Sequence, residues 1–318
     1  MKSIRTVVIP VAGLGTRLLP ASKAIPKEMV TVVDKPVIQH VVEEAVAAGM
    51  TKIVLVTRSG KEAIENHFDS HFELETQLQQ KGKVTLLNTI HEIIPKNIEM
   101  ISIRQPRAAG LGDAIRCAEP AVGSEPFAVM LPDVLFSSAD DARWNMKTMV
   151  DAYSQSGNAQ ILVEKVPETL VDQYGIVDCG VSDLHIGASA QVCDMVEKPS
   201  IDKAPSNLSI VGRYVLPPSI FKLLKATGKG AGGEIQLTDA LLKLMAQSNM
   251  QALMMRGRSF DCGNKLGFLH ANLMLGLQDE SIGSELMNIL QQTLTDFLNE
   301  SKVVTRHEVA DAGLAFLR

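Results

Sequence analysis

The chain has 318 residues, of which 46% are hydrophobic, so it is long enough for one large α/β domain with an appended segment. The net charge is −5 and no long Lys/Arg cluster is present, which argues against a nucleic-acid partner. Aromatic residues make up only 4%, so the core is expected to be aliphatic. No stretch approaches the roughly 18 apolar residues of a membrane span, and the first residues lack signal-peptide features. These patterns predict a cytoplasmic protein without a membrane partner.

Strand-like and helix-like segments alternate through the first half of the chain, which predicts a parallel sheet with right-handed crossovers. A helix is expected to begin near Pro36 with Asp34 as its cap and to end at Gly49. The other expected helices are residues 60–68 and 112–118, and the expected strands are residues 6–11, 52–57, 99–104 and 126–131.

The alternation is looser after residue 151. The expected strands there are residues 161–166, 175–179, 192–196 and 210–216, and the expected helices are residues 219–226, 235–245, 266–275 and 284–298. Residues 250–255 are rich in Met and are interpreted as core filling. Residues 301–318 have no strong pattern. The predicted fold class is α/β, a Rossmann-like domain with a mixed, mostly parallel central sheet flanked by helices, at residues 1–280. Residues 281–318 would form a C-terminal helical extension.

A glycine-rich segment follows the first expected strand. Gly13 and Gly15 would let the backbone approach a ligand closely and point N–H groups at phosphate. The cations Arg17, Lys23 and Lys27 come next, and the nearby Pro20 and Pro26 suggest a fixed, extended loop. Backbone donors combined with cations are suited to a triphosphate.

Two familiar glycine motifs do not match this segment. A dinucleotide fingerprint would place a third glycine where Leu18 lies, and a P-loop would end in Gly-Lys-Ser/Thr. A dehydrogenase is therefore disfavoured. For the two glycines alone, a plain strand-to-helix turn is an equally good interpretation.

The string GLGTRLLPASKAIPKEM, residues 13–29, resembles the signature loop of sugar-nucleotide pyrophosphorylases. Together with VAGLGTR, DKPVIQ and later motifs, it resembles the bacterial UTP–glucose-1-phosphate uridylyltransferase family, over about residues 6–277. The resemblance implies a nucleotidyltransferase domain, UTP and glucose 1-phosphate as substrates, Mg²⁺, and a homo-oligomer, either a tetramer or a dimer. It also implies a nucleotide-binding role for the early loop residues Ala12, Gly13, Gly15, Thr16 and Glu28.

Gln105 ends an expected strand and precedes a second glycine loop with Gly110 and Gly112. A side-chain amide both donates and accepts, as recognition of an imide such as uracil requires. From Gln105 alone, a surface residue before a loop is the simpler interpretation. The resemblance implies that Gln105 and this loop hold uracil. Asp113 stands where relatives often have His and receives no role.

Asp133 closes an apolar strand with a carboxylate. Magnesium takes few protein carboxylates and keeps water and phosphate oxygens as its other ligands, so one Asp can suffice. A helix N-cap is the alternative interpretation. The resemblance implies that Asp133 is a metal ligand and that Asp261 approaches the same metal or a second one.

The motifs YGIV and VEKP, residues 174–177 and 196–199, form the expected acceptor side. Glu197 and Lys198 on extended backbone would point in opposite directions, so a bulge or turn near Pro199 must bring both to one ligand. A surface charge pair before a turn is the alternative. The resemblance implies that Gly175 lies against the hexose, that Glu197 binds sugar hydroxyls and that Lys198 binds phosphate. Thr238 and Asp239 are interpreted as part of a helix start near the site.

These residues predict a direct displacement on the α-phosphorus of UTP, with Arg17, Lys27, Lys198 and Mg²⁺ neutralising charge. Two rival hypotheses stay open. One is the same chemistry on another pair, such as dTTP or a different hexose 1-phosphate. The other is a non-catalytic relative, which the intact Thr16 and Arg17 disfavour.

Overall fold

The computed structural model describes residues 4–181 and 183–315. Its contacts divide the chain into two compact units, Met1–Ala271 and Asn272–Arg318. The predicted domain boundary at 280/281 falls between α10 (Lys265–Gln278) and α11 (Gly283–Ala315). Within the described residues, every helix is too short or too polar to cross a membrane.

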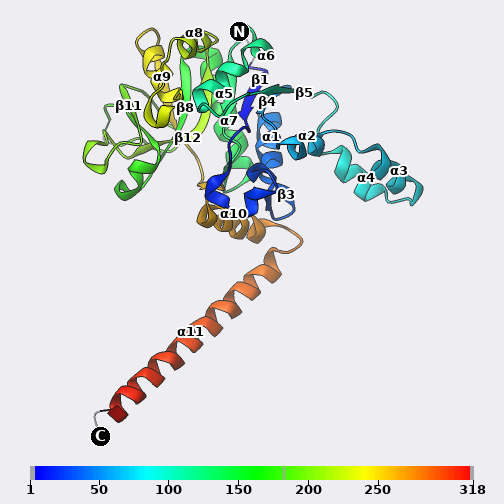
Figure 1. Cartoon of the computed structure of the whole chain (residues 1–318), viewed down its shortest axis with the longest axis vertical. Coiled ribbons are helices and arrows are strands. Elements are labelled where there is room, and N and C mark those ends of the chain that lie inside the picture. Colours follow the sequence, from blue (N-terminus) through cyan, green and yellow to red (C-terminus); the bar gives the residue numbers. More distant parts are fainter. Residues whose placement is uncertain (1–3, 182, 316–318) are drawn as a thin grey trace. The chain divides into compact units, whose positions relative to one another are not determined.

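The first unit is built on a ten-stranded mixed sheet, which runs in the order β10-β13-β8-β12-β6-β1-β4-β5, with β9 and β11 added at its side (Figure 1). The central strands β6, β1, β4 and β5 are parallel, β13 is parallel to β8, and β12 is antiparallel to both β6 and β8. The predicted fold class, a mixed sheet flanked by helices, is confirmed. The ten strands are β1 (Thr6–Pro10), β4 (Lys52–Thr57), β5 (Glu99–Arg104), β6 (Phe127–Met130), β8 (Ala159–Lys165), β9 (Gly175–Asp178), β10 (Ser189–Gln191), β11 (Asp194–Glu197), β12 (Leu208–Leu216) and β13 (Met250–Met254).

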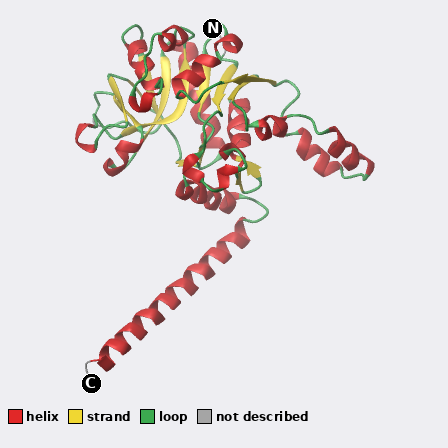
Figure 2. Cartoon of the chain, viewed as in Figure 1, coloured by secondary structure: helices red, strands yellow, loops and turns green. Residues whose placement is uncertain are grey.

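Helices pack on this sheet in two groups (Figure 2). Helices α5, α8 and α9 contact one another, whereas α1 contacts α7, and α7 contacts β8 and β12. The helices of the first unit before α10 are α1 (Val37–Ala47), α2 (Glu62–Phe68), α3 (Phe72–Gln80), α4 (Val84–His91), α5 (Leu111–Cys117), α6 (Glu119–Val122), α7 (Ala139–Ser156), α8 (Ile220–Lys225) and α9 (Leu237–Met245). Two short antiparallel pairs complete the strands: the hairpin of β2 (Thr31–Val32) with β3 (Lys35–Pro36), and the long-range pair of β7 (Val134–Phe136) with β14 (Ser259–Asp261).

The core is aliphatic, as predicted. Strand β1 is buried almost along its whole length, as parallel strands covered on both faces require. The Met-rich segment is confirmed as core, since Met250, Met254 and Met255 are all buried and β13 is part of the sheet. Aromatic packing is limited to contacts such as the stacked rings of Phe127 and Phe221, whose centroids are 4.9 Å apart.

The start of α1 differs from the prediction. Its N-cap is Pro36, and Asp34 does not cap the helix, because Lys35 and Pro36 pair with β2 in a hairpin instead. The predicted end is correct: Gly49 has φ +94°, which continues the chain in a conformation that glycine adopts at low cost.

The segment between β4 and β5 contains two helices that were not predicted from the sequence. Neither α3 nor α4 has a buried residue, and they pack on each other as an arm that extends away from the sheet (Figure 1). Helix α7 was also not predicted.

In the second unit, α11 continues to Ala315, through residues that show no strong sequence pattern.

Candidate functional site

The predicted nucleotide residues gather where parallel strands end. The glycine-rich loop follows β1, Gln105 follows β5 and Asp133 follows β6, and carboxyl ends of parallel strands meet at one edge of a sheet. They line a cavity of about 450 Å³, which we call the nucleotide cavity. Its lining residues are Pro10, Ala12, Gly13, Leu14, Gly15, Thr16, Lys27, Gln105, Ala108, Gly110, Leu111, Ala114, Leu131, Pro132, Asp133 and Glu234.

A second cavity of about 560 Å³, which we call the acceptor cavity, adjoins the first. Leu131 and Asp133 line both cavities. The acceptor cavity is lined by Arg17, Leu131, Asp133, Val134, Glu164, Asp172, Gln173, Tyr174, Lys198, Ile210, Val211, Gly212, Ser259 and Asp261. Asp133 is thus placed to act on two ligands at once.

The glycine-rich loop is compact, so the prediction of an extended loop is wrong. Residues 16–29 form three short 3₁₀ helices, Thr16–Leu18, Ala21–Lys23 and Lys27–Met29. Gly15 has φ +70°, its carbonyl accepts a hydrogen bond from Ser22 Oγ at 2.6 Å, and a Cβ there would lie 3.1 Å from the Lys27 Cβ. This close folding brings Lys27 back to the strand ends.

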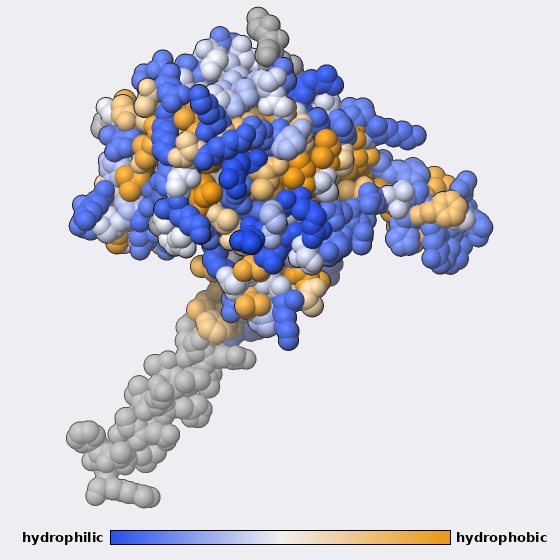
Figure 3. Space-filling model, turned by 45° about the horizontal axis from the view of Figure 1, so that its top comes forward, coloured by the Kyte–Doolittle hydropathy of each residue, from blue (hydrophilic) through white to orange (hydrophobic). Residues whose placement is uncertain are grey.

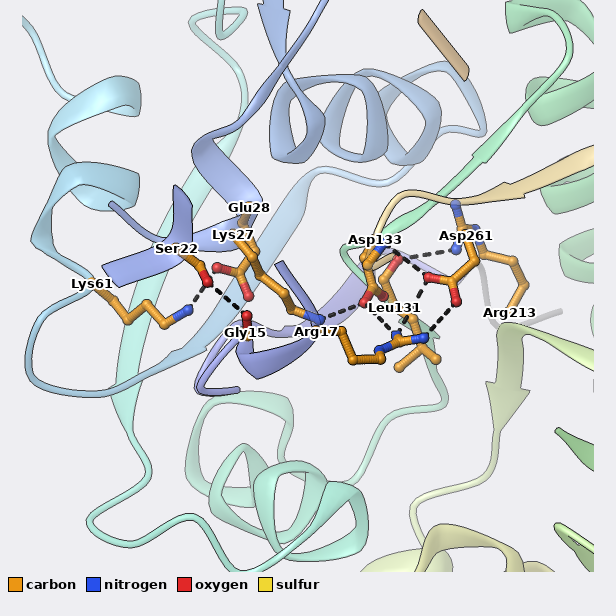
Figure 4. A network of polar contacts seen from close by, with 11 residues as sticks. Gly15, Arg17, Ser22, Lys27, Glu28, Lys61, Leu131, Asp133, Arg213 and Asp261 are labelled. Carbon is orange, nitrogen blue, oxygen red and sulfur yellow. Dashed lines mark hydrogen bonds and ion pairs between the residues drawn. The ribbon is translucent and has the colours of Figure 1, made fainter. Parts of the chain in front are cut away.

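Four charged side chains meet between the two cavities (Figure 4). Lys27 Nζ donates to Asp133 Oδ2, Arg17 Nη1 donates to Asp261 Oδ2 at 2.7 Å, and Arg17 Nη2 lies 3.7 Å from Asp133 Oδ2. The pairs link the N-terminal loop to β6 and β14. Two cations and two anions of this kind can bind both phosphate and metal.

Burial and pairing act in opposite directions on Lys27 and Asp133. Burial alone would lower the pKa of Lys27, but the charge and hydrogen bond of Asp133 outweigh it and the pKa lies above its ordinary value. Burial would likewise raise the pKa of Asp133, and Lys27 and Arg17 reverse that effect, so the pKa is lowered. Both groups are therefore charged near neutral pH.

The two carboxylates fit a magnesium ion. A Cβ at Gly263 would lie 2.6 Å from Asp133 Oδ2 and 2.8 Å from Asp261 Oδ1, so both oxygens converge on one point, and Arg17 Nη2 also lies 2.6 Å from that point. Among residues 4–181 and 183–315, no group of three or more His, Cys, Asp and Glu side chains is arranged to hold a metal. Mg²⁺ needs only one or two carboxylates when phosphate supplies other ligands, so the donor set is adequate.

The backbone around Asp133 is held by Arg213, a residue for which the sequence predicted no role. Arg213 donates to the carbonyl of Leu131 at 3.1 Å and to that of Val134 at 2.8 Å, on either side of Asp133. Its guanidinium is fully buried and also pairs with Glu44 of α1 through two hydrogen bonds of 2.7 and 2.8 Å. A lone Arg within the apolar run of β12 is the signal that could have revealed it.

The acceptor side turns at Lys198. This residue has φ +47°, directly after β11 ends at Glu197, as the predicted turn requires. The Lys198 backbone N–H donates to the carbonyl of Tyr174 at 3.0 Å, and its side chain lines the acceptor cavity. Glu197 Oε2 accepts from Thr238 Oγ1 at 2.7 Å, and a Cβ at Gly175 would lie 3.2 Å from the same oxygen.

Gly112 and Glu28 are the two nucleotide candidates that do not line the nucleotide cavity. Glu28 lies in a buried ion pair instead. Its side chain is 0% exposed, it is not among the lining residues of the nucleotide cavity, and Oε2 accepts from Lys61 Nζ at 2.6 Å. Among the described residues, Oε1 has no hydrogen-bond partner. Burial raises the pKa of Glu28 and lowers that of Lys61. A ribose contact by Glu28 stays a prediction.

Comparison with known proteins agrees with this geometry. Residues 6–276 match the family model of nucleotidyl transferases. The chain is 51% identical to the UTP–glucose-1-phosphate uridylyltransferase of Haemophilus influenzae over 286 residues, which cover 89% of this chain and 97% of that protein. It is 48% identical to the Escherichia coli K12 enzyme of the same name over 293 residues, 92% of this chain and 96% of that protein. The chain belongs to the bacterial UTP–glucose-1-phosphate uridylyltransferase family.

Solved structures of this family share the fold. A UDP-glucose pyrophosphorylase from Acinetobacter baumannii superimposes with a TM-score of 0.84 at 50% identity, over 91% of this chain and 99% of that one. A UTP-bound structure from the same organism gives the same values. The match to the nucleotidyl transferase family, over residues 6–276, includes every predicted site residue of this member of the uridylyltransferase family, from Ala12 to Asp261.

Proposed function

We propose that this chain transfers the uridylyl group of UTP to glucose 1-phosphate, which yields UDP-glucose and pyrophosphate. The observation that carries the proposal is the pair of cavities that meet at Asp133, with Lys27 and Arg17 between them. A transfer between two bound substrates needs two adjacent sites and cations where the phosphates meet. The activity for which the relatives are named, together with the UTP-bound Acinetobacter structure, supports UTP and glucose 1-phosphate as the pair.

The nucleotide cavity would take UTP. Gly13, Gly15, Gln105 and Gly110 all line this cavity. Gly13 and Gly15 would offer backbone N–H groups to the phosphates, and Gln105 and Gly110 would bind the base. The full nucleotide set that we propose is Ala12, Gly13, Gly15, Thr16, Glu28, Gln105, Gly110 and Gly112. The sugar phosphate would contact Gly175, Glu197 and Lys198. Of these, Lys198 lines the acceptor cavity, and Gly175 and Glu197 are chain neighbours of its lining residues Tyr174 and Lys198.

The reaction would be a direct displacement. A phosphate oxygen of glucose 1-phosphate forms a bond to the α-phosphorus of UTP, and the bond from that phosphorus to the bridging oxygen breaks, with pyrophosphate as leaving group. Because the attacking phosphate is already anionic, no protein nucleophile or general base is needed. Arg17, Lys27 and Lys198 would hold the two substrates together and offset their negative charge.

Asp133 and Asp261 would hold a Mg²⁺ ion, which when bound neutralises phosphate charge between the two substrates. The converging carboxylate oxygens at Gly263 support this assignment.

We also propose that the enzyme is a cytoplasmic homo-oligomer, a tetramer or a dimer. Exposed apolar side chains on the α3–α4 arm support an oligomer (Figure 3), with Phe72 82%, Val84 63% and Leu86 54% exposed. Sedimentation of the full chain tests the oligomer, and a monomer would contradict it.

The test of the reaction is pyrophosphate release by the purified chain with UTP and glucose 1-phosphate, with and without Mg²⁺. Reactions with dTTP, or with galactose 1-phosphate, in place of one substrate are the controls. Release that depends on Mg²⁺ and is fastest with UTP and glucose 1-phosphate is expected. A folded protein that binds UTP but releases pyrophosphate with none of the pairs would contradict the proposal.

A further inference from the structure

Gln105 offers one fixed face of its amide to the nucleotide cavity. Its backbone N–H donates to the Thr57 carbonyl at 2.8 Å, which extends the β4–β5 ladder by one residue. Its side chain is buried, with 4% exposed. A side chain held in this way cannot rotate freely to present either its NH₂ group or its amide oxygen to a base.

The two protein groups beside the amide determine its orientation. Gln105 Nε2 donates to Asp113 Oδ2 at 2.8 Å and to the Gly110 carbonyl at 3.3 Å. A carboxylate and a backbone carbonyl only accept hydrogen bonds, so the NH₂ group must face them and not the amide oxygen. The amide is planar, and Oε1 is therefore the atom that remains for a ligand.

Asp113 is itself held in place. It is buried, with 4% exposed, and its Oδ1 accepts from Arg116 Nη2, one turn further along α5. The loop beside it is equally restricted: a Cβ at Gly110 would lie 2.7 Å from the Ile235 carbonyl oxygen, and one at Gly112 would lie 2.8 Å from it. The shorter of the two hydrogen bonds that orient the Gln105 amide, at 2.8 Å, is thus made to a fixed carboxylate, and the Gly110 carbonyl at 3.3 Å is the weaker acceptor.

We infer that Asp113 is a positioning residue that determines base specificity, by holding Gln105 as a hydrogen-bond acceptor toward the base. This inference rests on the proposed binding of UTP in the nucleotide cavity. Uracil carries a hydrogen on N3 and can donate it to Gln105 Oε1. Cytosine has a lone pair on N3, so its ring nitrogen and Oε1 would be two acceptors facing each other, which is unfavourable in a buried site. Thymine has the same N3–H as uracil and is not distinguished.

The test compares equilibrium dissociation constants of UTP, CTP and dTTP for the unchanged chain and for Asp113→Asn. An asparagine of the same shape can donate as well as accept. It therefore allows the Gln105 amide to rotate so that Nε2, and not Oε1, faces the base. We expect the preference for UTP over CTP to fall at least about tenfold, with the ratio of UTP to dTTP unchanged. Asp140→Asn, at an exposed carboxylate on α7, is the matched control and should leave both ratios unchanged. An unaltered UTP to CTP ratio in folded Asp113→Asn would overturn the inference.

A ligand series on the unchanged chain tests the premise of the inference, that Gln105 Oε1 accepts from N3–H of the base, without a variant. UTP methylated at N3 has no hydrogen to donate, and we expect it to bind at least about tenfold more weakly than UTP. Equal binding of the two would overturn the inference even if Asp113→Asn does not fold. Because these are binding measurements, failure of the proposed transfer reaction would appear separately, as absence of pyrophosphate release with specific UTP binding intact.

Discussion

Asp133 lines both cavities, and its carboxylate is matched by Lys27 and Arg17. Asp133→Ala is expected to lower turnover about 100-fold or more, because the charge that would fix the metal is lost from between the substrates. Pyrophosphate release and circular dichroism measure activity and fold. Asp140→Ala removes an exposed carboxylate and is the control. Near-normal turnover of folded Asp133→Ala would exclude the metal-ligand role.

Lys198 is placed by a backbone turn at the acceptor cavity. Lys198→Ala is expected to raise the KM for glucose 1-phosphate about tenfold or more, the effect of one lost hydrogen bond to a charged group. The KM for UTP should stay unchanged, and steady-state kinetics with each substrate varied will show the difference. Lys203→Ala, at an exposed position just beyond the turn, is the control. A defect confined to UTP would contradict the assignment.

The buried pair of Arg213 and Glu44 supports the backbone on which Asp133 lies. Arg213→Met is expected to lower the free energy of unfolding by about 3–5 kcal/mol, because Glu44 is left as a buried, unpaired charge. The double variant Arg213→Met with Glu44→Leu should lose much less, as a pair of apolar side chains replaces the ion pair. Urea unfolding measures both, and an equal loss in the two variants would refute this account.

The loop between β5 and α5 approaches another segment too closely for a side chain. Gly110→Ala is expected to weaken UTP binding about tenfold or more, since its Cβ would lie 2.7 Å from the Ile235 carbonyl and force the loop aside. Gly123→Ala is a matched control, because Gly123 also has positive φ but has nothing within 4 Å of the added Cβ. Calorimetric titration with UTP distinguishes the two. Equal effects would show that backbone strain, and not the close approach, is responsible.

The predicted strands correspond closely to the observed ones, because β1, β4, β6 and β8 each contain at least three consecutive apolar residues that are buried, as is typical of strands inside such a sheet. Helices α3 and α4 escaped prediction since they have no buried residue. Helix α7 was missed although Met146, Met149 and Val150 are buried and lie at helical spacing. Periodicity detects an element only when the element packs on a core.

The site was predictable to the extent that its residues stand beside strand ends or glycines. Asp133 and Gln105 follow strands, and both line the nucleotide cavity. Arg213 and Lys61 could not be assigned, because their roles depend on partners, Glu44 and Glu28, that lie far away in the chain and become neighbours only in the fold. Local patterns identify the residues that could touch a ligand, but the residues that hold them in place are found only in the structure.

Across the whole molecule, every proposed site residue lies between Ala12 and Asp261, within the first compact unit. A chain shortened to residues 1–282 is therefore expected to bind UTP with the same dissociation constant as the full chain, because compact units of this kind fold by themselves. Titration calorimetry on both proteins tests this. A marked loss of affinity in the shortened chain would mean that residues 283–318 contribute to the nucleotide site.

The salt bridge of Arg17 and Asp261 joins residues that are 244 positions apart, and β1 cannot pair with β6 until Phe127 meets Thr6. During synthesis on the ribosome, β1 can pair with β6 only after residue 127 has been translated, and the loop with Gly110 and Gly112 can pack on Ile235 only later still. The nascent chain therefore leaves one side of the buried strand β1 unpaired until β6 has been made. The proposed site is therefore incomplete in any nascent chain that ends before β14, because Asp261 is still missing.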